Sequence, residues 1–243
     1  MIIMNNKLLK INTRFVSNIK SAPKPVLIPE GTDFIYFAND YQQGIGIPNR
    51  VTDSDMGTYE IYNGNDLIVN DPGHDCYLRQ PAISQSYRLQ IELTGERLTA
   101  MKALDGKSYT YYCRVYNTNG TGGIFCWRNG PYGDGYVYMM RSNGNSFQFH
   151  TSSGIDTLPL YDGNVIKIYV NSDTAVIKDL DTGDERTLNI TTNRTMNPRM
   201  TTFWAGYSTE AYLAKMYGLA GIHRETTADE DERFRNILHT QEI

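Results

Sequence analysis

The stretch from residue 109 to residue 172 constrains the fold most, because short alternating patterns follow one another there with glycine- and asparagine-rich turns between them. In the segment 109–116 successive side chains belong to opposite faces, and Tyr112 and Arg114 share one of these faces. Similar patterns follow at 124–128, 136–141, 146–150 and 165–171. Short strands joined by turns such as Ser-Asn-Gly-Asn at 142–145 predict hairpins, and therefore antiparallel sheets.

Strand patterns continue on both sides of this stretch. The segment 87–93 is the most regular of them, with apolar and polar residues in strict alternation. After the turn at 104–107 we expect it to pair with the strand at 109–116. Further strands are predicted at 59–62, 175–178, 185–190, 202–206 and 213–223.

One helix is predicted, at the C-terminal end. Thr227 would cap it, Glu230 three residues later completes a capping box, and Phe234, Ile237 and Leu238 give it an apolar stripe that should lie on the sandwich. The chain has 243 residues, enough to bury one large β core. The prediction is an all-β fold, a two-sheet antiparallel sandwich with a short C-terminal helix and an extended N-terminal arm.

Composition excludes some classes of function. The net charge is −4 and the pI is about 5.6, without the basic excess of nucleic-acid-binding proteins, so no nucleic-acid partner is predicted. The 18 tyrosines suit half-buried sheet surfaces, where the ring packs and the hydroxyl stays in water. Of the three cysteines, Cys113 and Cys126 could form a bridge, but the prediction is free thiols in a reducing cytoplasm.

Residues 1–50 are predicted to form an N-terminal arm and residues 51–243 the sandwich domain. Prolines between 19 and 29 disfavour both helix and central strand and favour an extended segment. A disordered leader is one alternative, but apolar residues at 26–28 and 34–37 favour an arm that docks on the sandwich or on a partner subunit. Because no signal-peptide pattern and no membrane-spanning apolar run is present, we expect the protein to stay in the cell unless the cell is lysed.

The polar loop at 65–75 raises the question of a bound metal ion. Asp66, Asp71 and Asp75 carry carboxylate oxygens of the kind that Ca²⁺ prefers. Their spacing is not that of an EF-hand loop, and acidic turns are usually solvated. No metal or other cofactor is therefore predicted, with Ca²⁺ in this loop as the alternative.

Several segments in the last two thirds of the chain together carry a resemblance to a known family. They are Gly135–Gly144 (GYVYMMRSNG), Asn164–Asn171 (NVIKIYVN), Phe203–Tyr207 (FWAGY), Tyr217–Arg224 (YGLAGIHR) and the TADEDE start of the helix. In their order and spacing, over about residues 87–238, they resemble the laminin-G-like branch of the concanavalin A-like lectin/glucanase superfamily. The resemblance implies a two-sheet jelly roll. The chain departs from the family pattern at Ser172, where a turn glycine is usual, and its first 60 residues match nothing in it.

The resemblance does not imply a catalytic activity. Glucanases of the superfamily carry Glu-x-Asp-x-(x)-Glu on a strand, because one carboxylate attacks the anomeric carbon and another protonates the leaving oxygen. No strand pattern here contains that set, and the acidic run at 229–232 complements the positive end of the helix dipole. A Gly-x-Ser-x-Gly motif, a phosphate-binding glycine motif and zinc-ligand spacing are also missing from the sequence. We therefore expect that the protein is not an enzyme.

If the protein binds a glycan, its site should combine aromatic faces with hydrogen-bonding groups. With the apolar positions of each strand taken as core, one polar and aromatic outer face is predicted to hold Tyr112, Arg114, Tyr116, Gln148, His150, Lys167 and Tyr169. The loop at 128–134 offers Tyr132 and Asp134 as a second candidate. The alternatives are an ordinary solvated sheet face and an ordinary turn.

Two functions from different classes are compatible with these features. The first is a structural component of a tailed-bacteriophage virion, such as a capsid fibre, decoration or tail-associated protein. It would be a homo-oligomer that attaches to other virion proteins through residues 1–50 and displays the sandwich outward, and lysis would release it without a secretion signal. The second is a carbohydrate-binding lectin-type module, acting at a cell surface or as an accessory to a glycoside hydrolase.

Overall fold

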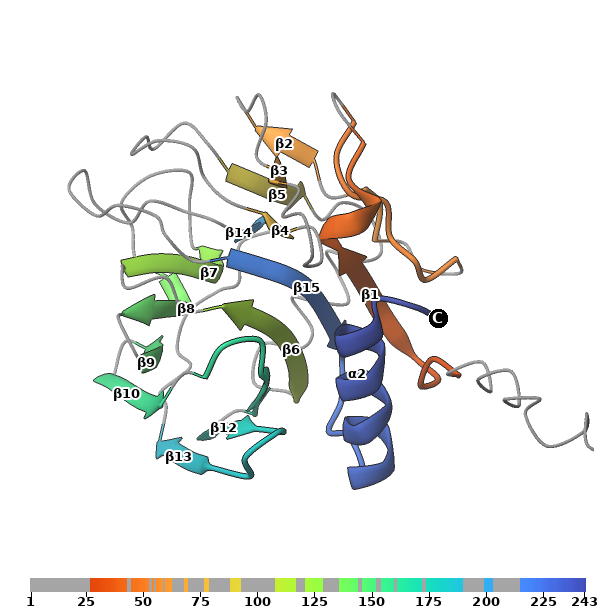
Figure 1. The fold of residues 1–243 in the computed structure, drawn as a ribbon. Helices are drawn as coiled ribbons and strands as arrows, with labels where there is room; N and C mark the ends of the chain where they lie inside the picture. Colours follow the sequence, from red (N-terminus) through yellow and green to blue (C-terminus); the bar gives the residue numbers. More distant parts are fainter. Residues whose placement is uncertain are drawn as a thin grey trace, which may run out of the picture.

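Two antiparallel β-sheets stack face to face, and one helix lies on the outer side of one sheet (Figure 1). The structure is a computed structural model. It describes residues 27–42, 45–52, 54, 56–58, 60–62, 68–69, 77–78, 88–92, 108–116, 121–128, 136–143, 146–151, 154–159, 161–171, 174–189, 199–202 and 215–243. In this part of the chain no helix is both long and apolar enough to cross a membrane.

The sheet under the helix, named here the helix-side sheet, contains eight strands within the described residues. Its order is β13-β12-β11-β6-β15-β4-β3, and β1 also pairs with β15. Along the chain these strands are β1 (Thr32–Phe37), β3 (Ile68–Val69), β4 (Tyr77–Leu78), β6 (Tyr109–Tyr116), β11 (Val165–Val170), β12 (Thr174–Asp179), β13 (Glu185–Asn189) and β15 (Lys215–Ile222).

The opposite sheet, named here the far sheet, contains seven strands within the same residues. Its order is β10-β9-β8-β7-β14-β5-β2. Along the chain they are β2 (Glu60–Tyr62), β5 (Arg88–Glu92), β7 (Thr121–Arg128), β8 (Tyr136–Asn143), β9 (Ser146–Thr151), β10 (Gly154–Pro159) and β14 (Arg199–Thr202). The remaining elements are the short 3-10 helix η1 (Ala38–Asp40) and the helix α2 (Ala228–Thr240).

The predicted fold class is confirmed, since the described elements form a two-sheet antiparallel sandwich with a C-terminal helix. The hairpin between β8 and β9 forms where the Asn-Gly turn predicted it, with Asn143 opposite Ser146. The predicted pairing of 87–93 with 109–116 is wrong. Strand β5 lies between β14 and β2 in the far sheet, whereas β6 lies between β11 and β15 in the helix-side sheet. An alternating pattern says that a segment is a two-sided strand but does not say which strand lies beside it.

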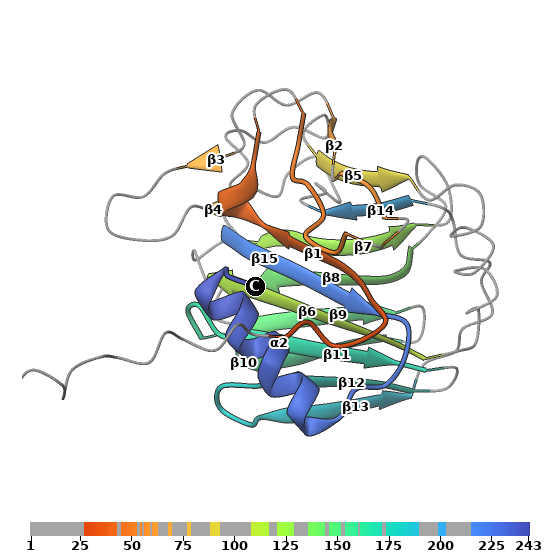
Figure 2. The same ribbon diagram turned by 90° about the vertical axis from the view of Figure 1, so that its right-hand side faces the viewer.

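Strand β1 carries large apolar side chains on both of its faces, and all six of its residues are buried. Phe34 and Tyr36 alternate along this strand with Ile35 and Phe37, so each face carries large side chains. The outer face joins α2 in one cluster of buried residues: Ile35, Phe37, Tyr112, Val165, Ala220, Ile222, Phe234, Ile237 and Leu238. Figure 2 shows α2 lying across this sheet.

A buried carboxylate fixes β1 to the strands around it. Asp33 is 2% exposed and accepts a hydrogen bond from the Tyr109 hydroxyl at 2.9 Å, and the Nδ1 atom of His223 lies 3.0 Å from its Oδ2 atom. Its charge is therefore compensated by hydrogen bonds, as a buried carboxylate requires. Residues 32–37 of the expected arm thus form a strand of the sandwich, while residues 1–26 lie outside the described residues and their docking role stays a prediction.

The predicted capping box of α2 is confirmed. The backbone N–H of Glu230 donates to Thr227 Oγ1 at 3.3 Å, and the Thr227 N–H donates to Glu230 Oε2 at 2.9 Å. The same carboxylate receives two hydrogen bonds from Arg224, at 2.9 and 2.5 Å. These bonds, from Arg224 first and then from the cap, lower the pKa of Glu230 to about 2.

Protonation of Glu230 should therefore destabilise the fold. An unfolded glutamate has a pKa of about 4.3, so the charged Glu230 contributes stability that is fully present above about pH 5 and is lost as the pH falls toward about 2. We expect Glu230→Gln to unfold at a lower temperature than the wild type at pH 6 and at nearly the same temperature at pH 2. Thermal unfolding followed by circular dichroism checks this, and an equal deficit at both pH values would contradict the assignment.

Candidate functional site

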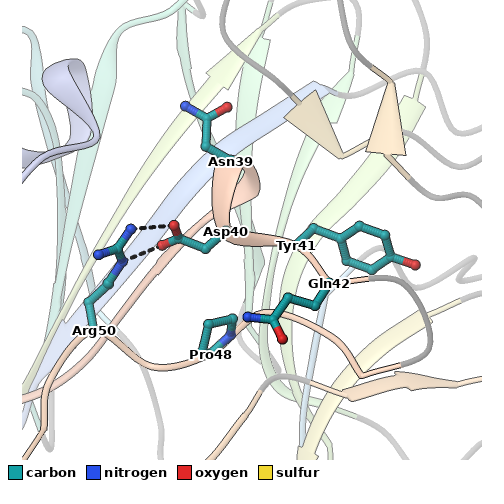
Figure 3. Close-up of a pocket in the computed structure, with 6 residues that line it drawn as sticks. All are labelled: Asn39, Asp40, Tyr41, Gln42, Pro48 and Arg50. Atoms are coloured by element: carbon teal, nitrogen blue, oxygen red, sulfur yellow. Dashed lines mark hydrogen bonds and ion pairs between the residues drawn. The ribbon is translucent and has the colours of Figure 1, made fainter.

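A polar pocket lies beside η1, where the chain leaves β1 and turns back toward Arg50 (Figure 3). Its volume is about 490 Å³, within the usual range of small-ligand sites. The residues that line it are Asn39, Asp40, Tyr41, Gln42, Pro48 and Arg50. All of them come from one short stretch of sequence, so the pocket is a local structure held on the edge of the sandwich.

An ion pair forms one wall of the pocket. Arg50 Nε donates to Asp40 Oδ2 at 2.5 Å, and Arg50 Nη2 donates to Asp40 Oδ1, so the pair is bidentate. The Asp40 side chain is 13% exposed and the Arg50 side chain 48%. The hydrogen bonds to Asp40 raise the pKa of Arg50, and the guanidinium carbon lies 5.9 Å from the centre of the Phe37 ring. The guanidinium is thus charged and held in a fixed orientation.

Asn49 holds the segment that carries Arg50. Its Oδ1 atom accepts from the backbone N–H of Ile35 at 3.0 Å and of Val51 at 3.1 Å. Its Nδ2 atom donates to the backbone oxygens of Asp33 at 3.1 Å and Met56 at 2.8 Å. One amide therefore joins β1 to two later parts of the chain, and it sets the distance between η1 and residue 50.

Gln42 and Pro48 line the other side of the pocket, and a backbone bridge from Gln42 to Gly46 lies between them in the sequence. The Gln42 N–H donates to the Gly46 oxygen at 2.8 Å, and the Gly46 N–H returns a bond to the Gln42 oxygen at 2.9 Å. Gly46 has a φ of 121°, which a side chain would disfavour. Figure 3 shows the Gln42 amide close to Pro48 and the Tyr41 ring directed away from the Asp40–Arg50 pair. The wall thus offers amide donors and acceptors next to a small apolar surface.

The predicted outer face does not exist as one surface. Tyr112, Arg114, Lys167 and Tyr169 lie in the helix-side sheet, whereas Gln148 and His150 lie on β9 in the far sheet. The expectation of a shared face is therefore wrong, because side-chain alternation was read without knowing that these strands belong to different sheets. Tyr116 ends β6, and the side chains of Tyr116 and His150 lie outside the described part of the structure.

Tyr112 and Lys167 lie under α2 and are not open to a large ligand. Tyr112 is fully buried, and its hydroxyl lies 2.6 Å from Thr226 Oγ1 and donates to Asp231 Oδ1 at 2.7 Å. Burial, together with the Asp231 charge, raises the pKa of this hydroxyl. Lys167 Nζ donates to the other oxygen of Asp231 at 2.7 Å. The polar face of β6 and β11 is thus used to seat the helix.

Arg114 secures the other end of α2. It donates from Nη1 to the backbone oxygen of His239 at 3.2 Å and from Nε to that of Gly163 at 3.1 Å, and it lies 4.7 Å over the Tyr217 ring. A cation near the C-terminal carbonyls complements the helix dipole. Arg114 therefore has a structural role that accounts for its contacts.

For the remaining candidate residues, a role in ligand binding stays a prediction. Tyr169 is half-buried, with its hydroxyl 3.0 Å from Ser108 Oγ, and Gln148 is half-buried on β9. Within the described residues there is no group of three or more His, Cys, Asp or Glu side chains that could hold a metal ion. The second site candidates and the possible Ca²⁺ ligands lie outside the described residues: Tyr132, Asp134, Asp66, Asp71 and Asp75.

Cys113 is a free thiol, buried on β6. Burial raises its pKa, so the thiol is protonated and packs as a small apolar side chain. Cys126 lies on β7 in the far sheet, so the alternative of a bridge between neighbouring strands is wrong.

Sequence reasoning missed the pocket. It placed residues 34–37 in a docking arm and gave no role to Asp40 or Arg50. The two charged residues are ten positions apart in an irregular segment, where no periodicity relates them. The available signal was a cluster of polar residues at 39–43 directly after an apolar strand. Binding residues often lie in loops that follow the strands of a rigid sheet.

No family model matches the chain, and no curated protein matches it by sequence. Solved structures share its fold. The binding domain of botulinum neurotoxin DC in complex with SialylT is 11% identical, with a TM-score of 0.56 over 86% of this chain and 52% of the other. A Trypanosoma rangeli sialidase in complex with 2,3-difluoro-KDN is 9% identical, with a TM-score of 0.58 over 87% and 33%. A botulinum neurotoxin type C structure, described with cell entry that depends on interaction with two ganglioside molecules, is 10% identical. Its TM-score is 0.54 over 85% of this chain and 51% of the other.

These similarities concern the fold. The chain spans about half the length of the neurotoxin chains and about a third of the sialidase chain. At such low sequence identities, the role of a binding-site residue in one protein cannot be assigned to a residue of the other. The chain therefore has a lectin-like β-sandwich fold, as the sequence resemblance implied.

Proposed function

We propose that this protein is a carbohydrate-binding lectin-type module of the concanavalin A-like superfamily, and that it binds glycan in the pocket between η1 and Arg50 without cleaving it. The pocket itself carries the proposal, because the guanidinium of Arg50, the carboxylate of Asp40 and the side-chain amide of Gln42 lie at one concave site. Solved structures with the same fold support the glycan-binding part of the proposal, since they are described with SialylT, ganglioside or 2,3-difluoro-KDN as ligands.

The lining suits a ligand rich in hydroxyl groups. A sugar hydroxyl both donates and accepts hydrogen bonds, and the side-chain amide of Gln42 offers both functions. Arg50 has five N–H donors, and two of them are used by Asp40, which leaves three for ligand oxygens. Pro48 adds an apolar patch for the C–H side of a sugar ring. The ligand would thus be oriented by several directional bonds on a preformed wall.

The same lining favours binding without turnover. Glycoside hydrolysis generally needs two carboxyl groups, about 5–9.5 Å apart, one of them free to give up a proton. Among the six lining residues Asp40 is the carboxylate, and both of its oxygens accept hydrogen bonds from Arg50. The six lining residues therefore supply one carboxyl group where hydrolysis generally needs two.

Replacing Arg50 with alanine should weaken glycan binding about tenfold to a hundredfold, the loss expected when a charge-assisted hydrogen bond to the ligand is removed. Arg235→Ala is the matched control, since Arg235 also donates to a carboxylate, that of Asp181 at 2.7 Å, but does so from α2. Binding is measured on a glycan array and then by calorimetry with the best glycan. Equal glycan affinity of Arg50→Ala and the wild type would contradict the assignment of this pocket as the glycan site. Gln42→Ala tests the same assignment without disturbing the Asp40–Arg50 ion pair.

The wider setting we propose is a bacteriophage virion, where the sandwich would be displayed and the segment before β1 would attach a homo-oligomer to other virion proteins. Two features support it. Leu27 is an apolar residue that is 70% exposed, which suits contact with a partner protein. The prolines and apolar residues just before it suit an attachment arm. Proteomics of purified phage particles tests the setting, and a secreted or cell-surface location without particles would support a free module instead.

A further inference from the structure

We infer that the pocket selects neutral sugars over acidic ones, a conclusion about ligand class that depends on the glycan-binding function proposed above. The inference comes from how charge is distributed among the six lining residues. Four of them carry no charge, and the two that do are paired with each other. The pocket wall is therefore polar but close to electrically neutral.

The ion pair is arranged so that Arg50 does not act as a free cation. Both oxygens of Asp40 accept from the guanidinium, and the Phe37 ring lies against its face. Asp40 is largely buried, whereas Arg50 is half-exposed, so the carboxylate stays next to the guanidinium when a ligand enters. Arg50 then serves as a positioned hydrogen-bond donor whose charge is already balanced.

An acidic sugar gains little from such a wall. A ligand carboxylate close enough to bond Arg50 also lies close to Asp40, and the repulsion from the second charge offsets much of the attraction to the first. Entry would also remove water from both the ligand carboxylate and the ion pair, which is costly without a surplus of positive charge. Hydroxyl groups meet no such repulsion, because the Gln42 amide and the N–H groups of Arg50 that Asp40 does not use can bond them directly.

The test uses two glycans that differ only in one terminal acidic sugar, N-acetyllactosamine and 3′-sialyl-N-acetyllactosamine. Each is titrated into the 243-residue chain, and an array of other neutral and sialylated pairs is measured beside them. We expect the wild type to bind neutral members at least about tenfold more tightly than their sialylated partners. Asp40→Asn leaves Arg50 unbalanced and should shift the preference about tenfold toward the sialylated member. Glu232→Gln removes the same charge from the exposed face of α2 and should leave the preference unchanged.

Each outcome has one meaning. Neutral preference that Asp40→Asn reverses or reduces supports the inference. Tighter wild-type binding of sialylated glycans, weakened by Arg50→Ala, overturns the inference and leaves the glycan-binding function in place. Neutral preference that Asp40→Asn does not change, in a variant whose melting temperature shows that it is folded, also overturns it. Binding of no glycan on the array overturns the proposed function, and the inference with it.

Discussion

Replacing Phe234 with alanine should lower the free energy of unfolding by about 3–5 kcal/mol, the usual cost of removing a phenylalanine ring from a packed core. Phe234 is fully buried between α2 and the helix-side sheet, and its ring stacks on Tyr112 with centroids 4.3 Å apart. Truncation removes that contact and leaves a cavity beneath the helix. Urea unfolding followed by circular dichroism measures the loss.

Asn236→Ala on the same helix is the matched control. Asn236 is exposed and donates to Glu232 at 3.3 Å, so its truncation should change the unfolding free energy by no more than about 0.5 kcal/mol. If Phe234→Ala cost less than about 1 kcal/mol, α2 would not be packed on the sandwich in solution. The access of ligands to the face of β6 and β11 would then have to be reconsidered, because that helix is what closes it.

The helix was predictable from sequence because its signals are local. The capping box spans Thr227 to Glu230, and the apolar stripe recurs at a spacing of three and four residues. The strand at 165–170 was predictable for the same reason, since Ile166 and Ile168 are fully buried and Lys167 and Tyr169 between them are only half-buried. A pattern that repeats within one element needs no knowledge of what lies beside it.

The surface under α2 was not predictable, because its polarity is misleading in isolation. Lys167 and Tyr112 look like solvent-facing residues beside an apolar row, yet each is paired with Asp231 on the helix. A row of polar side chains on one face of a strand can face water, or it can face polar side chains on another element. Here the partner is the acidic first turn of the helix, and only the tertiary fold brings that turn to the polar side chains of the strands.

The candidate pocket was missed for a related reason. Strand β1 was placed in an arm because the prolines before it suggest an extended segment, and a strand buried on both faces lacks the alternation that marks a half-buried one. Once β1 is placed beside β15, the residues that follow it, Asp40 among them, become a loop on a rigid sheet. The Asp40–Arg50 contact then depends on the amide of Asn49, which no sequence pattern relates to β1.

Gly221→Ala should destabilise the protein by about 2–3 kcal/mol, because the added methyl group has no room. A Cβ atom at Gly221 would lie 2.4 and 2.5 Å from two ring atoms of Phe34 and 3.1 Å from a ring atom of Tyr109. The Phe34 ring is itself stacked on Tyr36 at 5.3 Å, and the Tyr109 hydroxyl is bonded to Asp33. Neither ring can move away without breaking one of these contacts.

Gly57→Ala separates this packing effect from the general effect of replacing a glycine. A Cβ atom there meets nothing within 4 Å, so the change should be neutral or should stabilise by up to about 1 kcal/mol through the unfolded chain. Thermal and urea unfolding of both variants provide the comparison. Equal stabilities would mean that β15 and β1 do not pack as closely as this fold requires, and the support of the pocket by β1 would be lost with that packing.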